Sequence, residues 1–169
     1  MLRFLFGGLT DRQKPSQRLF DRVVAEARTP HWYLEGEVPD TLEGRFAMLA
    51  TLCALAIVRI EAQENSARES AAFAERFVEA MDAEHRQMGM NDPALGRRVR
   101  KLVGALARRT QEWRRTISGE ADWGIVTLSS VYGNEQASPQ ALAHSTESLR
   151  ASWSRFENAS DADLAEGQI

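Results

Sequence analysis

Two groups of residues have types and spacings that could support chemistry. Asp82 and His85 lie three residues apart in a segment with helical periodicity, and this carboxylate-x-x-His spacing occurs in helix-borne di-iron sites. Such sites need a second copy of the motif and further inward-facing glutamates, which the sequence lacks. Cys53 is the only cysteine, and its wholly apolar surroundings predict a buried, unreactive thiol. We therefore expect no catalytic residue, no metal ion and no cofactor.

The elements that must position any site are predicted to be helices of one all-α domain. The chain has 169 residues, of which 43% are hydrophobic, and this is enough for one buried core. Its longest apolar run, from Phe46 to Val58 and interrupted only by Thr51, has 13 residues, whereas a membrane span needs about 20. The run is apolar on every side of a helix over about 41–64, which predicts a central helix surrounded by protein.

About six helices are expected to form this domain, over residues 1–156. Periodicity and capping signals predict helices at 11–28, 41–65, 66–87, 92–117 and 138–156. Residues 122–132 fit either a short helix or an extended piece. Residues 157–169 are acidic and have no periodic apolar face, so we expect a loose tail there.

Charge is divided between two neighbouring predicted helices. Residues 61–86 contain seven acids and three bases, whereas residues 97–115 contain eight bases and one acid. The cations of the second helix face away from its apolar side, and they suit phosphates of RNA or anionic lipid headgroups. An equally good alternative is that the two helices pair with each other. The candidate contact residues for an electrostatic partner are Arg97, Arg100, Lys101 and Arg108.

Apolar residues outside the predicted core are candidates for binding a client protein. Met88 and Met90 flank a predicted helix end, and exposed methionines suit apolar partners of varied shape. Trp32 and Tyr33 lie in a connector between two prolines and are our other candidates for this contact. The segment Met1–Phe6 is too short for a signal peptide, and we interpret it as mobile or as a small hydrophobic hook.

Several short motifs occur together in order along the chain. They are Trp32-Tyr33, Asp40-Thr-Leu-Glu-Gly-Arg-Phe46, Phe77-Val-Glu-Ala-Met-Asp82, Arg86-Gln-Met-Gly-Met-Asn-Asp92 and Arg97-Arg-Val-Arg-Lys101. This set, over about residues 15–118, resembles the ubiquinol–cytochrome c chaperone family, the assembly factors of respiratory complex III. The matching family positions are Asp40, Gly44, Arg45, Phe46, Asp82, Arg86, Gly89 and Asp92. His85 and Gln87 depart from the family pattern around Arg86.

The resemblance implies a non-enzymatic, all-α assembly chaperone of the alphaproteobacterial type whose client is newly made cytochrome b. It also implies a cytoplasmic protein, peripheral at the inner membrane. A ribosome, an anionic membrane surface or a second assembly factor would be further partners, and DNA would not.

Two other functions remain open from the residues alone. The chain could be a basic-helix module that binds anionic lipid, ribosome or RNA without a dedicated client. It could also be a small enzyme acting on a lipid or quinone, which would need a closed apolar pocket with converging polar groups.

Overall fold

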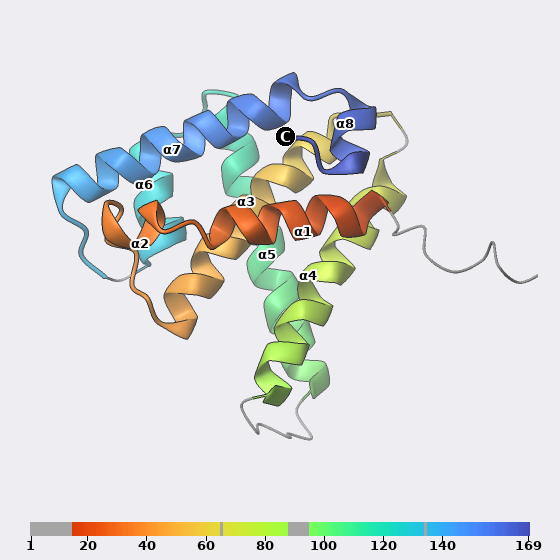
Figure 1. Cartoon of the computed structure of the whole chain (residues 1–169), viewed down its shortest axis with the longest axis horizontal. Helices are drawn as coiled ribbons and strands as arrows, with labels where there is room; N and C mark the ends of the chain where they lie inside the picture. Colours follow the sequence, from red (N-terminus) through yellow and green to blue (C-terminus); the bar gives the residue numbers. More distant parts are fainter. Residues whose placement is uncertain (1–14, 65, 88–94, 134) are drawn as a thin grey trace, which may run out of the picture.

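Every regular element in the described part of the chain is helical, which confirms the all-α class. The computed structural model describes residues 15–64, 66–87, 95–133 and 135–169 (Figure 1). Its elements in chain order are α1 (Pro15–Ala27), α2 (His31–Leu34), α3 (Leu42–Glu61), α4 (Ala67–Gln87), α5 (Leu95–Ile117), α6 (Trp123–Thr127), the π-helical turn η1 (Leu128–Tyr132), α7 (Pro139–Asn158) and α8 (Asp161–Glu166).

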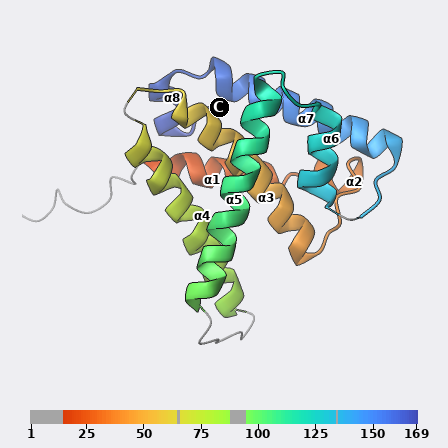
Figure 2. The ribbon, with the colours of Figure 1, turned by 180° about the vertical axis from the view of Figure 1, so that it is seen from behind.

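Helix α3 forms the centre of this arrangement, as its apolar circumference predicts. Thirteen of its 20 residues are buried. It packs against α1, α4, α5, η1 and α7, so that neighbours surround it. Figures 1 and 2 show α1 crossing one side of α3 and α5 crossing the opposite side. The burial of so many apolar side chains in one helix makes α3 the main source of the hydrophobic core.

The start of α3 differs in detail from the sequence prediction. Asp40 and Thr41 are both residue types that cap helices, and Thr41 is the one that does so here, since its hydroxyl accepts a hydrogen bond from the amide of Gly44 at 3.1 Å. Asp40 is left to bind Arg45 instead. Gly44 lies so close to the preceding connector that a Cβ atom there would overlap the carbonyl oxygen of Pro39. A glycine at this position therefore lets the connector turn tightly onto the helix.

Helices α4 and α5 form an antiparallel pair that extends beyond the other helices. The two helices contact each other, and in both ribbon views they run side by side away from α7 and α8 (Figure 2). Phe73 and Phe77 of α4 and Leu102, Leu106 and Trp113 of α5 are buried. Asp92-Pro93, the predicted start of the second helix, lies outside the described residues, and α5 is described from Leu95.

The ambiguous segment 122–132 is a helix with a π-helical end. The side chain of Asp122 caps α6 by accepting a hydrogen bond from the amide of Ile125 at 2.9 Å. The wider η1 turn then carries Ser130 into the core. There its hydroxyl bonds with the hydroxyl of Thr51 at 2.7 Å and accepts from the Trp113 indole at 3.2 Å. The turn thereby links α3, α5 and η1 through buried polar groups.

The expectation of a loose tail at 157–169 is wrong for these residues. Helix α7 continues to Asn158, and α8 follows with a capping box between Ser160 and Asp163. One buried residue, Leu164, anchors α8 against α1. A helix of six residues needs only one apolar contact, so periodicity could not reveal it. The short α2 was missed for the same reason.

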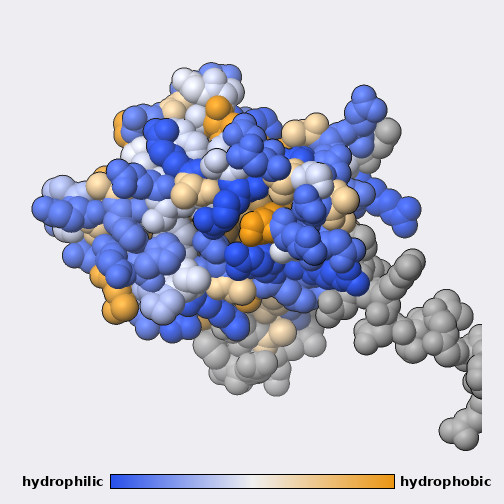
Figure 3. Space-filling view, turned by 45° about the horizontal axis from the view of Figure 1, so that its top comes forward, coloured by the Kyte–Doolittle hydropathy of each residue, from blue (hydrophilic) through white to orange (hydrophobic). Residues whose placement is uncertain are grey.

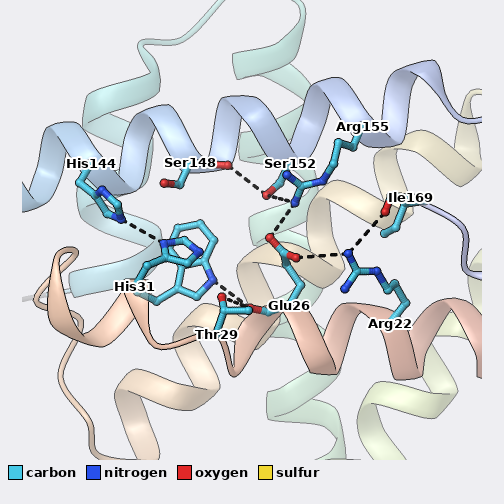
Figure 4. Close-up of polar contacts among 10 residues, drawn as sticks. Arg22, Glu26, Thr29, His31, His144, Ser148, Ser152, Arg155 and Ile169 are labelled. Atoms are coloured by element: carbon cyan, nitrogen blue, oxygen red, sulfur yellow. Dashed lines mark hydrogen bonds and ion pairs between the residues drawn. The ribbon is translucent and has the colours of Figure 1, made fainter.

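A polar cluster joins the first two helices to α7 (Figure 4). Nδ1 of His31 and Nε2 of His144 lie 3.0 Å apart, so the two rings share one proton in a hydrogen bond. Burial lowers the pKa of His31, and the charge of His144 lowers it further, while Glu26 and Glu35 act in the opposite direction. Glu26 is itself bound to Arg155 of α7 at 2.6 Å. The cluster holds the end of α1 and α2 against α7.

We predict that Gly44→Ala lowers the free energy of unfolding by about 1–3 kcal/mol, because the new Cβ must push the Pro39 carbonyl away. The control is Gly104→Ala in α5, where the nearest atom to a new Cβ is Arg108 Nη1 at 3.7 Å. Alanine favours a helix over glycine by about 1 kcal/mol, so this control should keep or raise stability. Urea denaturation measures both, and equal stability of the two variants would contradict the role of Gly44.

We also predict that the protein loses stability below neutral pH through His31. The folded state favours the neutral ring, so this contribution is complete above the unfolded pKa of about 6.5. It is lost as the pH falls from there through the lower pKa of the folded state. The measurement is the urea midpoint of unfolding at one pH above this range and one below it. The difference between the two midpoints should be smaller for His31→Gln than for the unchanged chain. An identical pH dependence in both would count against the pair.

Candidate functional site

A cleft of about 830 Å³ lies between α1, the start of α3, the second half of α4 and the first half of α5. All four helices contribute apolar side chains to its walls, and the polar side chains stand among them. The lining residues are Gln17, Phe20, Asp21, Val24, Ala27, Arg28, Tyr33, Leu42, Glu43, Arg45, Phe46, Leu49, Ala80, Met81, Ala83, Lys101, Leu102 and Ala105.

Aromatic side chains form a rigid part of the cleft wall. The ring of Phe46 packs against Phe77 with centroids 5.7 Å apart, and that of Phe20 packs edge-on against Phe73 at 5.8 Å. Phe46 is half-buried, so part of its ring remains available to the cleft. The guanidinium of Arg109 lies 5.8 Å from the Phe46 centroid, and burial lowers the pKa of this group. Contacts of this kind hold Phe46 in place, and they give the cleft a preformed apolar wall.

A polar cluster fixes the rim of the cleft where the connector meets α3. Nε of Arg45 donates to Oδ1 of Asp40 at 2.6 Å, and this bond lowers the pKa of the Asp40 carboxyl. The Arg45 guanidinium also lies 5.6 Å from the centre of the Tyr33 ring. Tyr33 in turn donates its hydroxyl to the carbonyl of Ala27 at 2.8 Å, and burial raises its pKa. These contacts tie the connector to α1 and α3.

The structure brings together four of the residues proposed from the sequence. All four line the cleft, and Tyr33 comes from α2, Arg45 and Phe46 from α3, and Lys101 from α5. Arg100 and Arg108 are exposed elsewhere on α5. Asp40 and Gly44 do not line the cleft, but Asp40 binds Arg45, and Gly44 admits the carbonyl of Pro39 close to α3. Asp82 is half-buried on α4 and is not among the lining residues.

The proposal that Trp32 contacts a client is wrong for this structure. Its side chain is fully buried, and its indole donates to the carbonyl of Glu26 at 2.9 Å. Trp32 therefore anchors α2 in the core, while its neighbour Tyr33 reaches the cleft. The sequence predicts the same contact for both residues, because a connector sequence does not show which of two adjacent side chains turns inward.

Some predicted residues lie where their side chains are not described. Met88, Gly89, Met90 and Asp92 fall outside the described residues, and so does the proposed methionine surface. Arg86 and Arg97 belong to α4 and α5, but their side chains are not among those described. The described ion pairs of α5 include Arg114 with Glu61 of α3 and Arg115 with Glu120. Pairing between the acidic and basic helices therefore stays a hypothesis.

Apart from four alanines, six apolar residues of the cleft were not predicted as site residues from the sequence. Each occupies a position that periodicity assigns to a helix's inner face, and a core wall and a cleft wall have the same pattern. They are Phe20, Val24, Leu42, Leu49, Met81 and Leu102. Whether such a residue lies in the core or in the wall of a cleft depends on where neighbouring helices move apart in space.

The described residues contain no group of three or more His, Cys, Asp or Glu side chains that could hold a metal ion. Cys53 is fully buried within α3, and burial raises the pKa of its thiol strongly. Among the described helices, none is long and apolar enough to span a membrane. The molecular face in Figure 3 is mostly hydrophilic, and its apolar side chains form only small patches. The apolar side chains that line the cleft suit it to binding an apolar group.

The chain resembles known proteins both in its sequence and in its fold. A search of curated proteins gave no match. The fold matches the crystal structure of the Cbp3 homolog from Brucella abortus with a TM-score of 0.76 and 23% identity, over 92% of this chain and 87% of that one. The family described as ubiquinol-cytochrome C chaperone matches residues 34–169, further toward the C-terminus than the sequence motifs reach. The chain thus belongs to the ubiquinol-cytochrome C chaperone family.

Proposed function

We propose that this protein is an assembly chaperone of respiratory complex III that holds an apolar segment of newly made cytochrome b in the cleft. The observation that carries the proposal is the convergence of Tyr33, Arg45 and Phe46 on one apolar cleft. All three residues belong to the motifs that resemble the family, and the family is one of chaperones. The cleft, with about 830 Å³, has room for several side chains of a client.

The chemistry of the cleft supports binding without catalysis. Its deeper walls are aliphatic and aromatic, and its charged groups stand at exposed positions on the rim. Burial of an apolar side chain there would contribute about 1.5–3 kcal/mol, so a few such contacts suffice for a reversible complex. Release of the client then requires only competition from its next partner.

The basic side of α5 supplies a second contact in this proposal. Arg100 and Arg108 are exposed, and Lys101 stands where this side meets the cleft. Exposed cations on one helix attract phosphate groups, as on a ribosome or an anionic membrane surface. The protein would then act in the cytoplasm, peripheral at the inner membrane, beside the site where cytochrome b emerges. A second assembly factor is a further candidate partner.

The exposure of these cations also favours a second candidate function. In that case α5 binds anionic lipid, ribosome or RNA, and the protein has no dedicated client. The two functions differ in whether the cleft or α5 determines the capture of cytochrome b.

We predict that Leu42→Glu lowers the amount of newly made cytochrome b captured by the full chain by about ten-fold or more. Leu42 lines the cleft in the first turn of α3, where a carboxylate suits the helix dipole, so the fold should tolerate the change. A charge in the cleft opposes the entry of an apolar segment. The measurement is pull-down of the tagged protein after cell-free translation of cytochrome b.

The matched control is Ile125→Glu. Ile125 is 70% exposed, occupies the first turn of α6 and lies outside the cleft. This variant should capture cytochrome b as well as the unchanged chain does. Equal capture by Leu42→Glu and Ile125→Glu would refute a role for the cleft, provided both variants melt at similar temperatures.

We further predict that the double variant Arg100→Glu/Arg108→Glu weakens binding to vesicles of phosphatidylglycerol and phosphatidylcholine. Each cation near such a surface contributes about 1 kcal/mol, and the salt dependence of binding should fall with them. Arg68→Glu, an exposed change on α4, is the control. If the double variant loses cytochrome b capture while Leu42→Glu keeps it, the second candidate function is the correct one.

A further inference from the structure

The cations of α5 fall into two groups. In its last turn, Arg114 and Arg115 each form an ion pair with a glutamate. Nearer its start, Arg100, Lys101 and Arg108 are exposed, and the ion pairs between described residues include none of these three. The charge of this part of the helix is therefore available to a partner.

Apolar side chains lie on the same face of α5 as Arg100. Val103 is 47% exposed, and Ala107 is exposed one turn further on. Successive members of this set are three and four positions apart, so they share one face of the helix. An RNA backbone would leave the valine in water, whereas the boundary of a bilayer offers phosphates to the cations and acyl chains to the valine. The combination favours a lipid surface over RNA.

This face of α5 is accessible to a flat surface and lies apart from the cleft. In Figure 2 α5 runs in front of the other helices, and α1 crosses α3 on the opposite side. Leu102 and Ala105 line the cleft, and they follow Arg100 by two and five positions, which places them on the other side of the helix. A bilayer against the Arg100 face would therefore leave the cleft open.

We propose that α5 lies flat on a bilayer that contains anionic lipid, with Arg100 and Arg108 at the phosphates and Val103 at the boundary of the acyl chains. The inference rests on the proposed function, because it names the partner of the basic side of α5. Client and membrane then contact different sides of one helix. The protein can thus hold a client in the cleft while it stays on the membrane.

The variant Val103→Ser in the full chain tests the apolar part of this contact. Serine and valine have similar helix propensities, so α5 should stay intact. Loss of the valine should weaken binding to vesicles of phosphatidylglycerol and phosphatidylcholine by about three-fold, measured by co-sedimentation. Val103→Leu, which enlarges the apolar side chain, should bind at least as tightly as the unchanged chain.

The matched control is Ile125→Ser, which removes an exposed apolar side chain from α6 and should leave the vesicle affinity unchanged. Equal affinities of Val103→Ser and the unchanged chain would overturn the inference, and so would equal losses in Val103→Ser and Ile125→Ser.

Binding of polyuridylate separates a lipid surface from RNA. Loss of the cations in Arg100→Glu/Arg108→Glu weakens either contact, whereas Val103→Ser should leave the RNA affinity unchanged. If Val103→Ser weakens binding to polyuridylate and to vesicles by the same factor, the valine does not act through lipid and the inference is wrong.

A fluorescent label tests the orientation of the helix. Ala107→Cys places the dye NBD on the proposed face of α5, and Ala25→Cys places it at an exposed position of α1, across α3 from α5. Cys53 is fully buried and does not take up the label. Vesicles that contain a doxyl-labelled lipid should quench the dye at position 107 at least about three-fold more strongly than the dye at position 25. Equal quenching would contradict the flat placement of α5.

The two proposals fail in different ways. If Leu42→Glu abolishes capture of cytochrome b while Val103→Ser keeps its vesicle affinity, the cleft binds the client and α5 does not insert into a bilayer. If Val103→Ser loses vesicle affinity while Leu42→Glu leaves capture intact, the membrane contact exists and the client binds elsewhere.

Discussion

The fold depends on one constraint: the middle of α3 is apolar on every side, so it must be shielded from water all the way round. Its apolar residues surround the helix axis, so α1, α4, α5, η1 and α7 must together cover it. These neighbours cross α3 at different angles and cannot all stay in contact with one another along their lengths (Figures 1 and 2). The cleft lies near the start of α3, where α1, α4 and α5 contribute its walls. The candidate binding site is thus a by-product of covering a central helix.

Within this apolar centre, a few polar side chains select one packing arrangement. Thr51 is the polar residue in the middle of the α3 run, and it faces Ser130 in the π-helical turn. Ser130 also accepts a hydrogen bond from the Trp113 indole, so α3, α5 and η1 share one small hydrogen-bonded group. Moving any of them along its axis would leave buried donors without acceptors, which costs about 1–3 kcal/mol for each group. Apolar packing alone would permit such sliding more easily.

The sequence was sufficient to predict those features that arise from long periodic segments. The central helix, the amphipathic α1, α4, α5 and α7, and the serine cap of α7 all follow from patterns that extend over several turns. Features that rest on one residue were not predictable in the same way. Leu164 anchors α8, the side chain of Trp32 turns into the core, and Gly44 leaves room for the carbonyl of Pro39 to approach α3 closely.

The candidate site shows the same division. Arg45 and Phe46 were identified because they belong to a recognisable motif, and Tyr33 because it lies in an aromatic connector. The other walls of the cleft, such as Leu42 and Met81, have the periodicity of core residues. Whether an inward-facing side chain meets another helix or an opening depends on the crossing angles of the helices, which no local pattern encodes.

The contact between α8 and α1 has a consequence for the order in which the protein is made. Arg18 pairs with Glu166, two residues separated by 148 positions, and the backbone at Gly167 lies close to the carbonyl of Arg18. Helix α1 forms one wall of the cleft, yet α8, which supports it, follows all the other described elements in the chain and is made after them. A partly synthesised chain therefore has its central helix and most of the cleft residues before this wall is supported. The cleft therefore has its α1 wall supported only after α8 has been made.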